Sequence, residues 1–152
     1  ICTVSDNDPR DISLFDRVRI ANSFDPKSTI FVSIHCNASP FHNASGFEIY
    51  TTKGLTNSDL LADYIADSVE HLYNNVGINL RYDLSDRDKD KEVDFYVLRK
   101  TKCPAVLVEC GFFDFRSDFE MLKNPLFQAN LGSFIYTGII RYINKQNKKH
   151  LI

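Results

Sequence analysis

Two ionisable side chains follow apolar, β-branched runs in this sequence and could do chemistry together. His35 follows the run at residues 30–34, and Glu109 follows the run at residues 105–108. A neutral imidazole fixed at a strand end is a good zinc ligand, and a nearby carboxylate can serve as general base for a bound water. The pair therefore suggests metal-assisted hydrolysis, with His35 as metal ligand and Glu109 as catalytic base.

Each of the two residues also has a structural explanation. A core strand can simply end on a polar histidine, so His35 alone does not establish a metal site. Glu109 is harder to explain in this way, because an unpaired buried carboxylate is costly and needs a partner or a task. The elements around the two residues must decide between these readings.

Helices and strands are predicted to alternate along the chain. Apolar residues at helical spacing predict helices over residues 12–22, 58–73, 117–122 and 125–143. Ser13 and Ser117 are candidate N-caps, and the helix that opens at Ser58 is expected to stop before Gly77. Apolar and β-branched runs predict strands over residues 29–34, 46–52, 95–98 and 105–110. The first and the last of these strands are expected to be buried.

This alternation predicts an α/β fold with a mostly parallel or mixed central sheet flanked by helices, a three-layer sandwich. One domain is expected over residues 1–144, followed by a basic polar tail over residues 145–152. Ligands of such sheets bind outside the carboxyl ends of the strands. His35 and Glu109 are both expected at such ends, which favours a shared site.

The composition narrows the function classes. The chain has 152 residues, 43% of them hydrophobic and 25% charged, and its net charge of −2 gives no reason to expect nucleic acid as a partner. No apolar run approaches the roughly 20 residues that span a bilayer, so membrane insertion is not expected. The cysteines show no CxxC spacing, which argues against a zinc ribbon or a redox motif, and no disulfide framework is expected among Cys2, Cys36, Cys103 and Cys110.

Four segments, in order, resemble the zinc-dependent N-acetylmuramoyl-L-alanine amidases of the amidase-3 type, including phage endolysin catalytic domains. They are DISLFDRVRIAN at 11–22, FVSIHCNA at 31–38, GFEIY at 46–50, and YVLR at 96–99 with CPAVLVECGF at 103–112. The charged insertion before residue 95 looks most like that of phage or phage-derived members.

The resemblance implies hydrolysis of the amide between the lactyl group of N-acetylmuramic acid and L-alanine in peptidoglycan, with zinc as cofactor. By position, His35 matches a zinc-ligating histidine and Glu109 matches the catalytic glutamate. Arg17, Asn37 and Gly46 match recurring framework residues. The implied place of action is the bacterial cell wall, reached from the host cytoplasm at lysis if the protein is phage-derived, and a monomer is expected.

The chain also departs from the family pattern. The family's first zinc histidine and a zinc-ligating glutamate lie on a first strand and helix that have no counterpart here, and the chain starts at Ile1 in an apparent strand at 1–4. We therefore expect an N-terminally truncated fragment that lacks two zinc ligands, rather than a working amidase, with an exposed apolar sheet face or edge.

Two rival readings stay open. One is a non-catalytic module that binds peptidoglycan or a partner through the same cleft. The other is a different metallohydrolase, in which His42 joins His35 and Glu109 in a metal site. For His42 a solvent-exposed position in a loop is the simpler explanation. His71 and His150 are expected at the surface.

The charged stretch and three aromatic residues each have a structural and a functional interpretation. The charged stretch at 79–94 is most simply a solvated loop, with a substrate-facing role as the alternative. Tyr50, Phe112 and Phe113 could line a cleft, but core packing is the default expectation.

Overall fold

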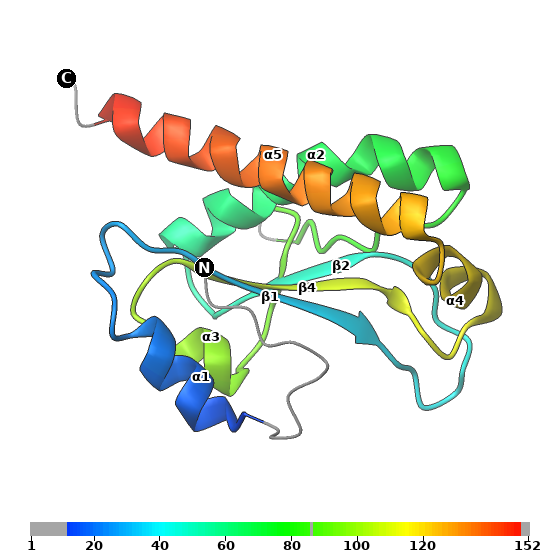
Figure 1. Ribbon diagram of the computed structural model, residues 1–152, viewed down its shortest axis with the longest axis horizontal. Coiled ribbons are helices and arrows are strands. Elements are labelled where there is room, and N and C mark those ends of the chain that lie inside the picture. Colours follow the sequence, from blue (N-terminus) through cyan, green and yellow to red (C-terminus); the bar gives the residue numbers. More distant parts are fainter. Residues whose placement is uncertain (1–11, 86, 150–152) are drawn as a thin grey trace.

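The computed structural model describes residues 12–85 and 87–149 (Figure 1). The strand predicted at 1–4, Cys2 and His150 lie outside the described residues.

A four-stranded mixed sheet forms the centre of the molecule. It consists of β1 (Phe31–Asn37), β2 (Glu48–Thr51), β3 (Lys91–Glu92) and β4 (Ala105–Phe112) in the order β1-β4-β2-β3. β1 and β4 are parallel, whereas β2 runs antiparallel to β4 and parallel to β3. The predicted α/β class with a mixed sheet is confirmed.

Helices cover both faces of this sheet (Figure 1). The long helices α2 (Asn57–Val76) and α5 (Pro125–Lys149) lie together on one face, and α1 (Leu14–Ala21) and α3 (Tyr96–Lys100) lie on the other. The short α4 (Arg116–Leu122) follows β4 at the edge of the first layer. The predicted three layers are therefore present.

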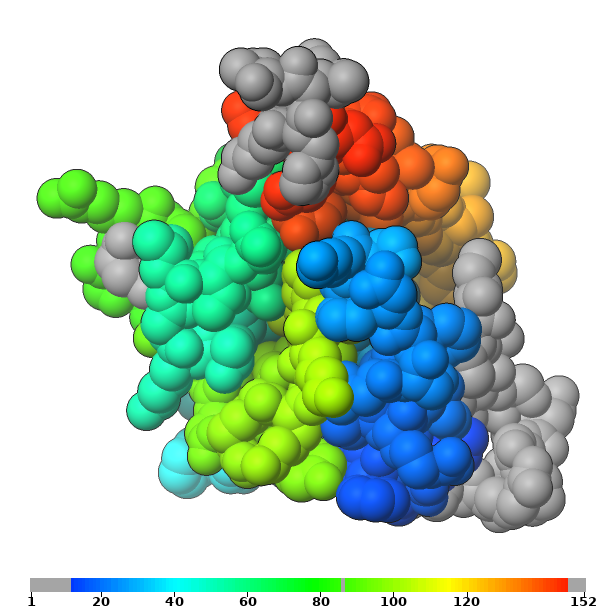
Figure 2. Space-filling view, turned by 90° about the vertical axis from the view of Figure 1, so that its left-hand side faces the viewer, coloured from blue at the N-terminus to red at the C-terminus, as the bar shows by residue number. Residues whose placement is uncertain are grey.

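Each face has its own hydrophobic core. The larger core, between the sheet and α2 with α5, includes Phe47, Ile49, Ile65, Tyr73 and Val108. The smaller core, under α1 and α3, is made of Val18, Val97, Leu98, Ala105 and Leu107. Figure 2 shows α1 in blue beside the yellow-green segment that contains α3. Alternate residues of β2 and β4 thus face different cores, as the period of a strand requires.

Local capping explains where the first two helices begin and end. Ser13 caps α1 by accepting a hydrogen bond from the Asp16 amide, as predicted. α2 begins one residue before the predicted start, because Thr56 and Asp59 form a reciprocal capping box. It ends at Gly77, whose φ of 69° is the left-handed conformation that glycine adopts at low cost.

Two local predictions are wrong. Residues 95–98, predicted as a strand, lead into helix α3, because β3 already occupies the sheet edge beside β2 while Val97 and Leu98 pack into the smaller core. So short an apolar run has no periodicity that separates helix from strand. Ser117 does not cap α4: the N-cap is Phe115, which makes no side-chain capping bond.

Two other elements differ in extent or exposure. α5 continues to Lys149, six residues beyond the predicted end at Ile143, so much of the predicted polar tail is helical. β1 is only partly buried, and Ile34 is 59% exposed, because β4 is its single neighbour among the described strands. The prediction of a fully buried first strand is therefore wrong.

Two expectations from composition can be compared with the structure. Cys36, Cys103 and Cys110 are free thiols. Among the described residues, no helix is both long and apolar enough to cross a membrane.

The packing of α2 on α5 depends on Gly138. A Cβ built on Gly138 would lie 2.6 Å from the Cα of Ile65 and 2.7 Å from the carbonyl oxygen of Tyr64, so the two helix backbones touch here. A Cβ on Gly132, in the same helix, would meet nothing within 4 Å. The two glycines therefore form a matched pair.

We predict opposite effects of alanine at these two positions. Gly138→Ala should lower the free energy of unfolding by about 1–3 kcal/mol, because the helices must separate. Gly132→Ala should raise it by up to about 1 kcal/mol, because alanine is the better helix former. Chemical denaturation followed by circular dichroism measures both, and equal effects would contradict the close approach.

Candidate active site

Three ionisable side chains lie in one row across the sheet. His35 of β1 is the register partner of Glu109 in β4, and Glu109 is also opposite Glu48 of β2. Register partners on neighbouring strands point to the same face, and here that is the face of α1 and α3. The structure thus brings His35 and Glu109 side by side near the carboxyl ends of two parallel strands. It adds Glu48, which the sequence analysis did not single out.

Glu48 is almost completely buried, with 3% of its surface exposed. Its Oε1 accepts from Arg81 Nε at 2.7 Å and from Lys91 Nζ at 2.5 Å. Its Oε2 accepts from Asn37 Nδ2 at 2.8 Å and from the Tyr50 hydroxyl at 2.5 Å. Burial pushes its pKa upward, but the hydrogen bonds from Arg81, Lys91 and Tyr50 outweigh burial and hold the pKa below its ordinary value. Glu48 is therefore an ionised, saturated carboxylate.

Glu109 has a different environment although it is the next carboxylate in the row. Its Oε2 is buried and has no hydrogen-bond partner among the described residues. Burial, and then the negative charge of Glu48, raise the pKa of Glu109 to about 7. One carboxylate of the pair is consequently held by four hydrogen bonds, whereas the other has a buried oxygen without a partner and a raised pKa.

His35 is held in the neutral form. Its Nε2 lies 2.7 Å from the Ser33 hydroxyl, two residues earlier on the same face of β1. Burial lowers its pKa below the ordinary value, and the positive charge of Arg17 lowers it further. A neutral imidazole is the form that binds a metal or accepts a proton.

A second buried carboxylate fixes the sheet edge where the row lies. Asp118 of α4 is fully buried, and its Oδ2 accepts from the backbone amides of Gly46 and Phe112, at 2.8 and 2.9 Å. Its Oδ1 accepts from the Ser45 hydroxyl. Asp118 thus joins the start of β2 to the end of β4, and so fixes how Glu48 and Glu109 face each other.

The charged stretch at 79–94 is not simply a solvated loop. It is mostly irregular, as predicted, but Arg81 and Lys91 reach Glu48, and Asp90 is buried with its Oδ2 bonded to the Thr51 hydroxyl. Lys89 ties the same stretch to α2 through ion pairs with acidic residues there. The interpretation as a solvated surface is therefore wrong for these residues.

The other predicted residues lie apart from the row. His42 pairs with Asp114 at 2.8 Å and is mostly exposed. Within the part of the chain that the structure describes, no group of three or more His, Cys, Asp or Glu side chains could hold a metal ion. A metal site made of His35, His42 and Glu109 is therefore not supported. His71 is exposed, as expected.

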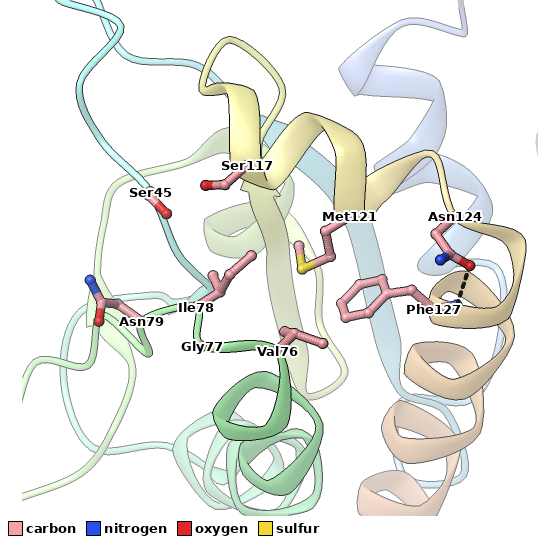
Figure 3. Close-up of a pocket in the computed structure, with 9 residues that line it drawn as sticks. All are labelled: Ser45, Val76, Gly77, Ile78, Asn79, Ser117, Met121, Asn124 and Phe127. Carbon is pink, nitrogen blue, oxygen red and sulfur yellow. Dashed lines mark hydrogen bonds between the residues drawn. The ribbon is translucent and has the colours of Figure 1, made fainter.

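The aromatic residues divide between core and surface. Phe112 is buried, Tyr50 packs at the edge of the smaller core, and Phe113 is largely exposed. A cavity of about 260 Å³ lies at a different place, between the end of α2, α4 and the start of α5 (Figure 3). Neither His35 nor Glu109 is among its lining residues, so the row across the sheet remains the candidate site.

Sequence reasoning missed Glu48 and Asp118. Glu48 lies between two buried apolar residues of a strand, and alternation alone would have assigned it to an exposed face. The charged stretch contains the cations that a buried carboxylate needs, but nothing in the sequence pattern pairs Arg81 and Lys91 with Glu48. For Asp118 no signal existed, because its partners are two backbone amides and the hydroxyl of Ser45, 73 residues earlier.

Residues 1–141 match a protein family described as N-acetylmuramoyl-L-alanine amidase. The chain belongs to this amidase family. It is 33% identical to the N-acetylmuramoyl-L-alanine amidase LytC of Bacillus subtilis over 133 residues, which is 86% of this chain and 24% of LytC. It is 32% identical to the endolysin of Bacillus phage SPP1 over 135 residues, 89% of this chain and 47% of the endolysin.

Solved amidase structures share the fold. The N-acetylmuramoyl-L-alanine amidase of Clostridium difficile 630 superposes with a TM-score of 0.74 at 30% identity, over 88% of this chain and 66% of that one. The catalytic domain of the amidase CwlV of Paenibacillus polymyxa gives a TM-score of 0.67 at 26% identity, over 88% and 66%. The chain thus spans about half, or less, of the two curated relatives and two thirds of these structures.

Two matched substitutions in the row should change the free energy of unfolding of this amidase-family chain differently. Glu48→Gln should lower the free energy of unfolding by about 1–3 kcal/mol, because it leaves buried donors without their charged acceptor. Glu109→Gln, on the neighbouring strand, should be neutral or stabilising, because it removes a carboxylate whose Oε2 has no partner. Urea denaturation in chelator-treated buffer compares the two, and an equal loss would show that Glu48 is not the residue that holds the site together.

Proposed function

We propose that the protein hydrolyses the amide bond between the lactyl group of N-acetylmuramic acid and L-alanine in peptidoglycan. Membership of the amidase family supports this substrate class. The observation that carries the proposal is the register of β1 and β4, which sets His35 beside Glu109 at the carboxyl ends of the strands. Ligand sites of α/β sheets lie at such ends.

Glu109 is the residue proposed to move the proton. Its side chain is half-buried, and no described residue forms a hydrogen bond with its Oε2, so this carboxylate is not committed to a structural partner and is the candidate proton acceptor of the row. Water oxygen adds to the lactyl carbonyl carbon, the carbon–nitrogen bond breaks, and the proton passes to the leaving amine. The products are a lactyl carboxylate and the free amino group of L-alanine.

Zinc is the cofactor that the family resemblance implies, with His35 as a ligand. A catalytic zinc site has three protein donors and one open position. The row supplies His35 and Glu109, whereas both oxygens of Glu48 are already occupied by four donors. The described residues therefore do not complete a zinc site, in agreement with the absence of any three-donor group among them.

This incomplete donor set favours a second candidate function. A non-catalytic module that binds peptidoglycan or a partner would need the cleft but not the metal. Hydrolysis separates the two candidates, because a binding module retains the cell wall without releasing L-alanine amino groups.

The proposed place of action is the bacterial cell wall, with peptidoglycan as partner and the protein as a monomer. The similarity to a phage endolysin supports release at lysis as one route to the wall.

The first test is hydrolysis of purified peptidoglycan in zinc-containing buffer, with new L-alanine amino termini measured by mass spectrometry. Glu109→Gln should lower the rate by about 10²–10⁴-fold, because the proton acceptor is lost. Glu120→Gln, an exposed glutamate of α4, is the control and should keep the parent rate. A Glu109→Gln variant as fast as the parent would refute the assigned role, and wall binding without hydrolysis would favour the binding module.

The second test is elemental analysis of the 152-residue chain purified without chelator. We expect less than one zinc per chain, because the described residues provide too few donors, and His35→Ala should remove what is bound. One zinc per chain that survives His35→Ala would refute the ligand role of His35. One zinc per chain that is lost on His35→Ala would overturn the expectation of an incomplete site, and His42 would be the first further donor to test.

A further inference from the structure

Glu48 binds two cationic side chains, one more than is needed to neutralise its charge. Arg81 and Lys91 meet at one carboxylate oxygen in the row that contains Glu109. Both cations pair with the single carboxylate of Glu48, and Glu109, the next carboxylate of the row, forms no ion pair with either of them among the described residues, so one positive charge has no ion-pair partner of its own. Since Glu48 is buried beneath them, that charge can be met only from the solvent side.

Both cations keep part of their side chain in solvent. The side chain of Arg81 is 40% exposed and that of Lys91 is 27% exposed. Glu48 uses only the Nε–H of Arg81, and neither Nη atom has a hydrogen-bond partner in the described part of the chain. An arginine fork with free N–H groups suits a carboxylate, which it can bind through two parallel hydrogen bonds.

The position of Arg81 is fixed by more than this ion pair. Its amide donates to the Phe47 carbonyl, and its guanidinium carbon lies 5.5 Å from the centre of the Phe112 ring. Its side-chain carbons pack against Gly46, where a Cβ would approach them to 3.0 Å and would clash with the Asn79 carbonyl. The guanidinium is therefore pre-organised, which lowers the entropic cost of binding a ligand.

We infer that Arg81 and Lys91 form a subsite for a carboxylate of the stem peptide, close to the amide that is cleaved. This inference rests on the proposed function, because that function supplies the peptide. Side chains opposite each other on antiparallel strands are about 5 Å apart at Cβ, which is the separation expected between Glu109 and Glu48. An extended peptide advances about 3.3–3.6 Å per residue. A carboxylate on the residue after L-alanine therefore reaches these cations when the amide lies at Glu109.

The substrate class follows from this geometry. In peptidoglycan the residue after L-alanine is a γ-linked D-glutamate, whose α-carboxylate is either free or amidated. The subsite should favour stems with the free carboxylate, because a carboxamide offers no charge to the excess cation.

The test measures binding, which needs no turnover. The probes are N-acetyl-L-alanyl-γ-D-glutamyl methylamide and its α-carboxamide counterpart, titrated into the folded chain by NMR. The free carboxylate should bind about tenfold more tightly, the difference expected of a charge-assisted hydrogen bond. Arg81→Gln and Lys91→Gln should each reduce this ratio toward one. Lys89→Gln is the matched control, because Lys89 belongs to the same stretch but pairs with Asp67 and Glu70 of α2.

Equal binding of the two probes by the parent chain, or no binding of either, would overturn the inference. So would a ratio that persists in both folded Arg81 and Lys91 variants. Hydrolysis of amidated and unamidated walls at equal rates would reject the subsite and leave the amidase proposal intact. Selective binding without any hydrolysis would reject the amidase proposal and leave the subsite in place.

Discussion

The burial of the Glu48 carboxylate is the constraint on which the candidate site depends. A carboxylate removed from water must receive charge and hydrogen bonds from its surroundings, or it will not stay ionised. Glu48 receives them from β1, from its own strand, and from both ends of the charged stretch at 79–94. Arg81 and Lys91 therefore tie this stretch to the sheet, to which its described residues contribute the two-residue strand β3.

The same constraint separates the roles of two neighbouring carboxylates. Glu48 and Glu109 occupy opposite positions on adjacent strands, yet their environments differ completely. Four donors surround the first, whereas one oxygen of the second is buried without a partner. If the donors were shared, neither carboxylate would be free to accept a proton. Because the four donors all bind Glu48, Glu48 stays ionised and fixed in place. Glu109 is left without these donors and is available as the proposed proton acceptor.

The sequence predicted the elements better than the contacts between them. The apolar runs before His35 and Glu109 located β1 and β4, and parallel strands of an α/β sheet bring such ends together. The exposure of Ile34 and the helical state of Tyr96–Lys100 were not predictable, because both depend on which strand lies next in the sheet. The pairing of Glu48 with Arg81 and Lys91 joins residues 33 and 43 positions apart. No local pattern records such a pairing, since the partners are selected by the folded sheet.

Recognition and chemistry thus lie on different parts of the row. The proposed carboxylate subsite is carried by Arg81, which lies beside the start of β2, and by Lys91 of β3. The proposed proton transfer and metal ligation belong to β4 and β1. The subsite requires no metal, because its charge comes from side chains that are fixed by Glu48. An amidase and a peptidoglycan-binding module built on this chain would therefore share the same peptide recognition. They would differ in whether further donors join His35, so metal binding, rather than peptide recognition, would decide between enzyme and binding module.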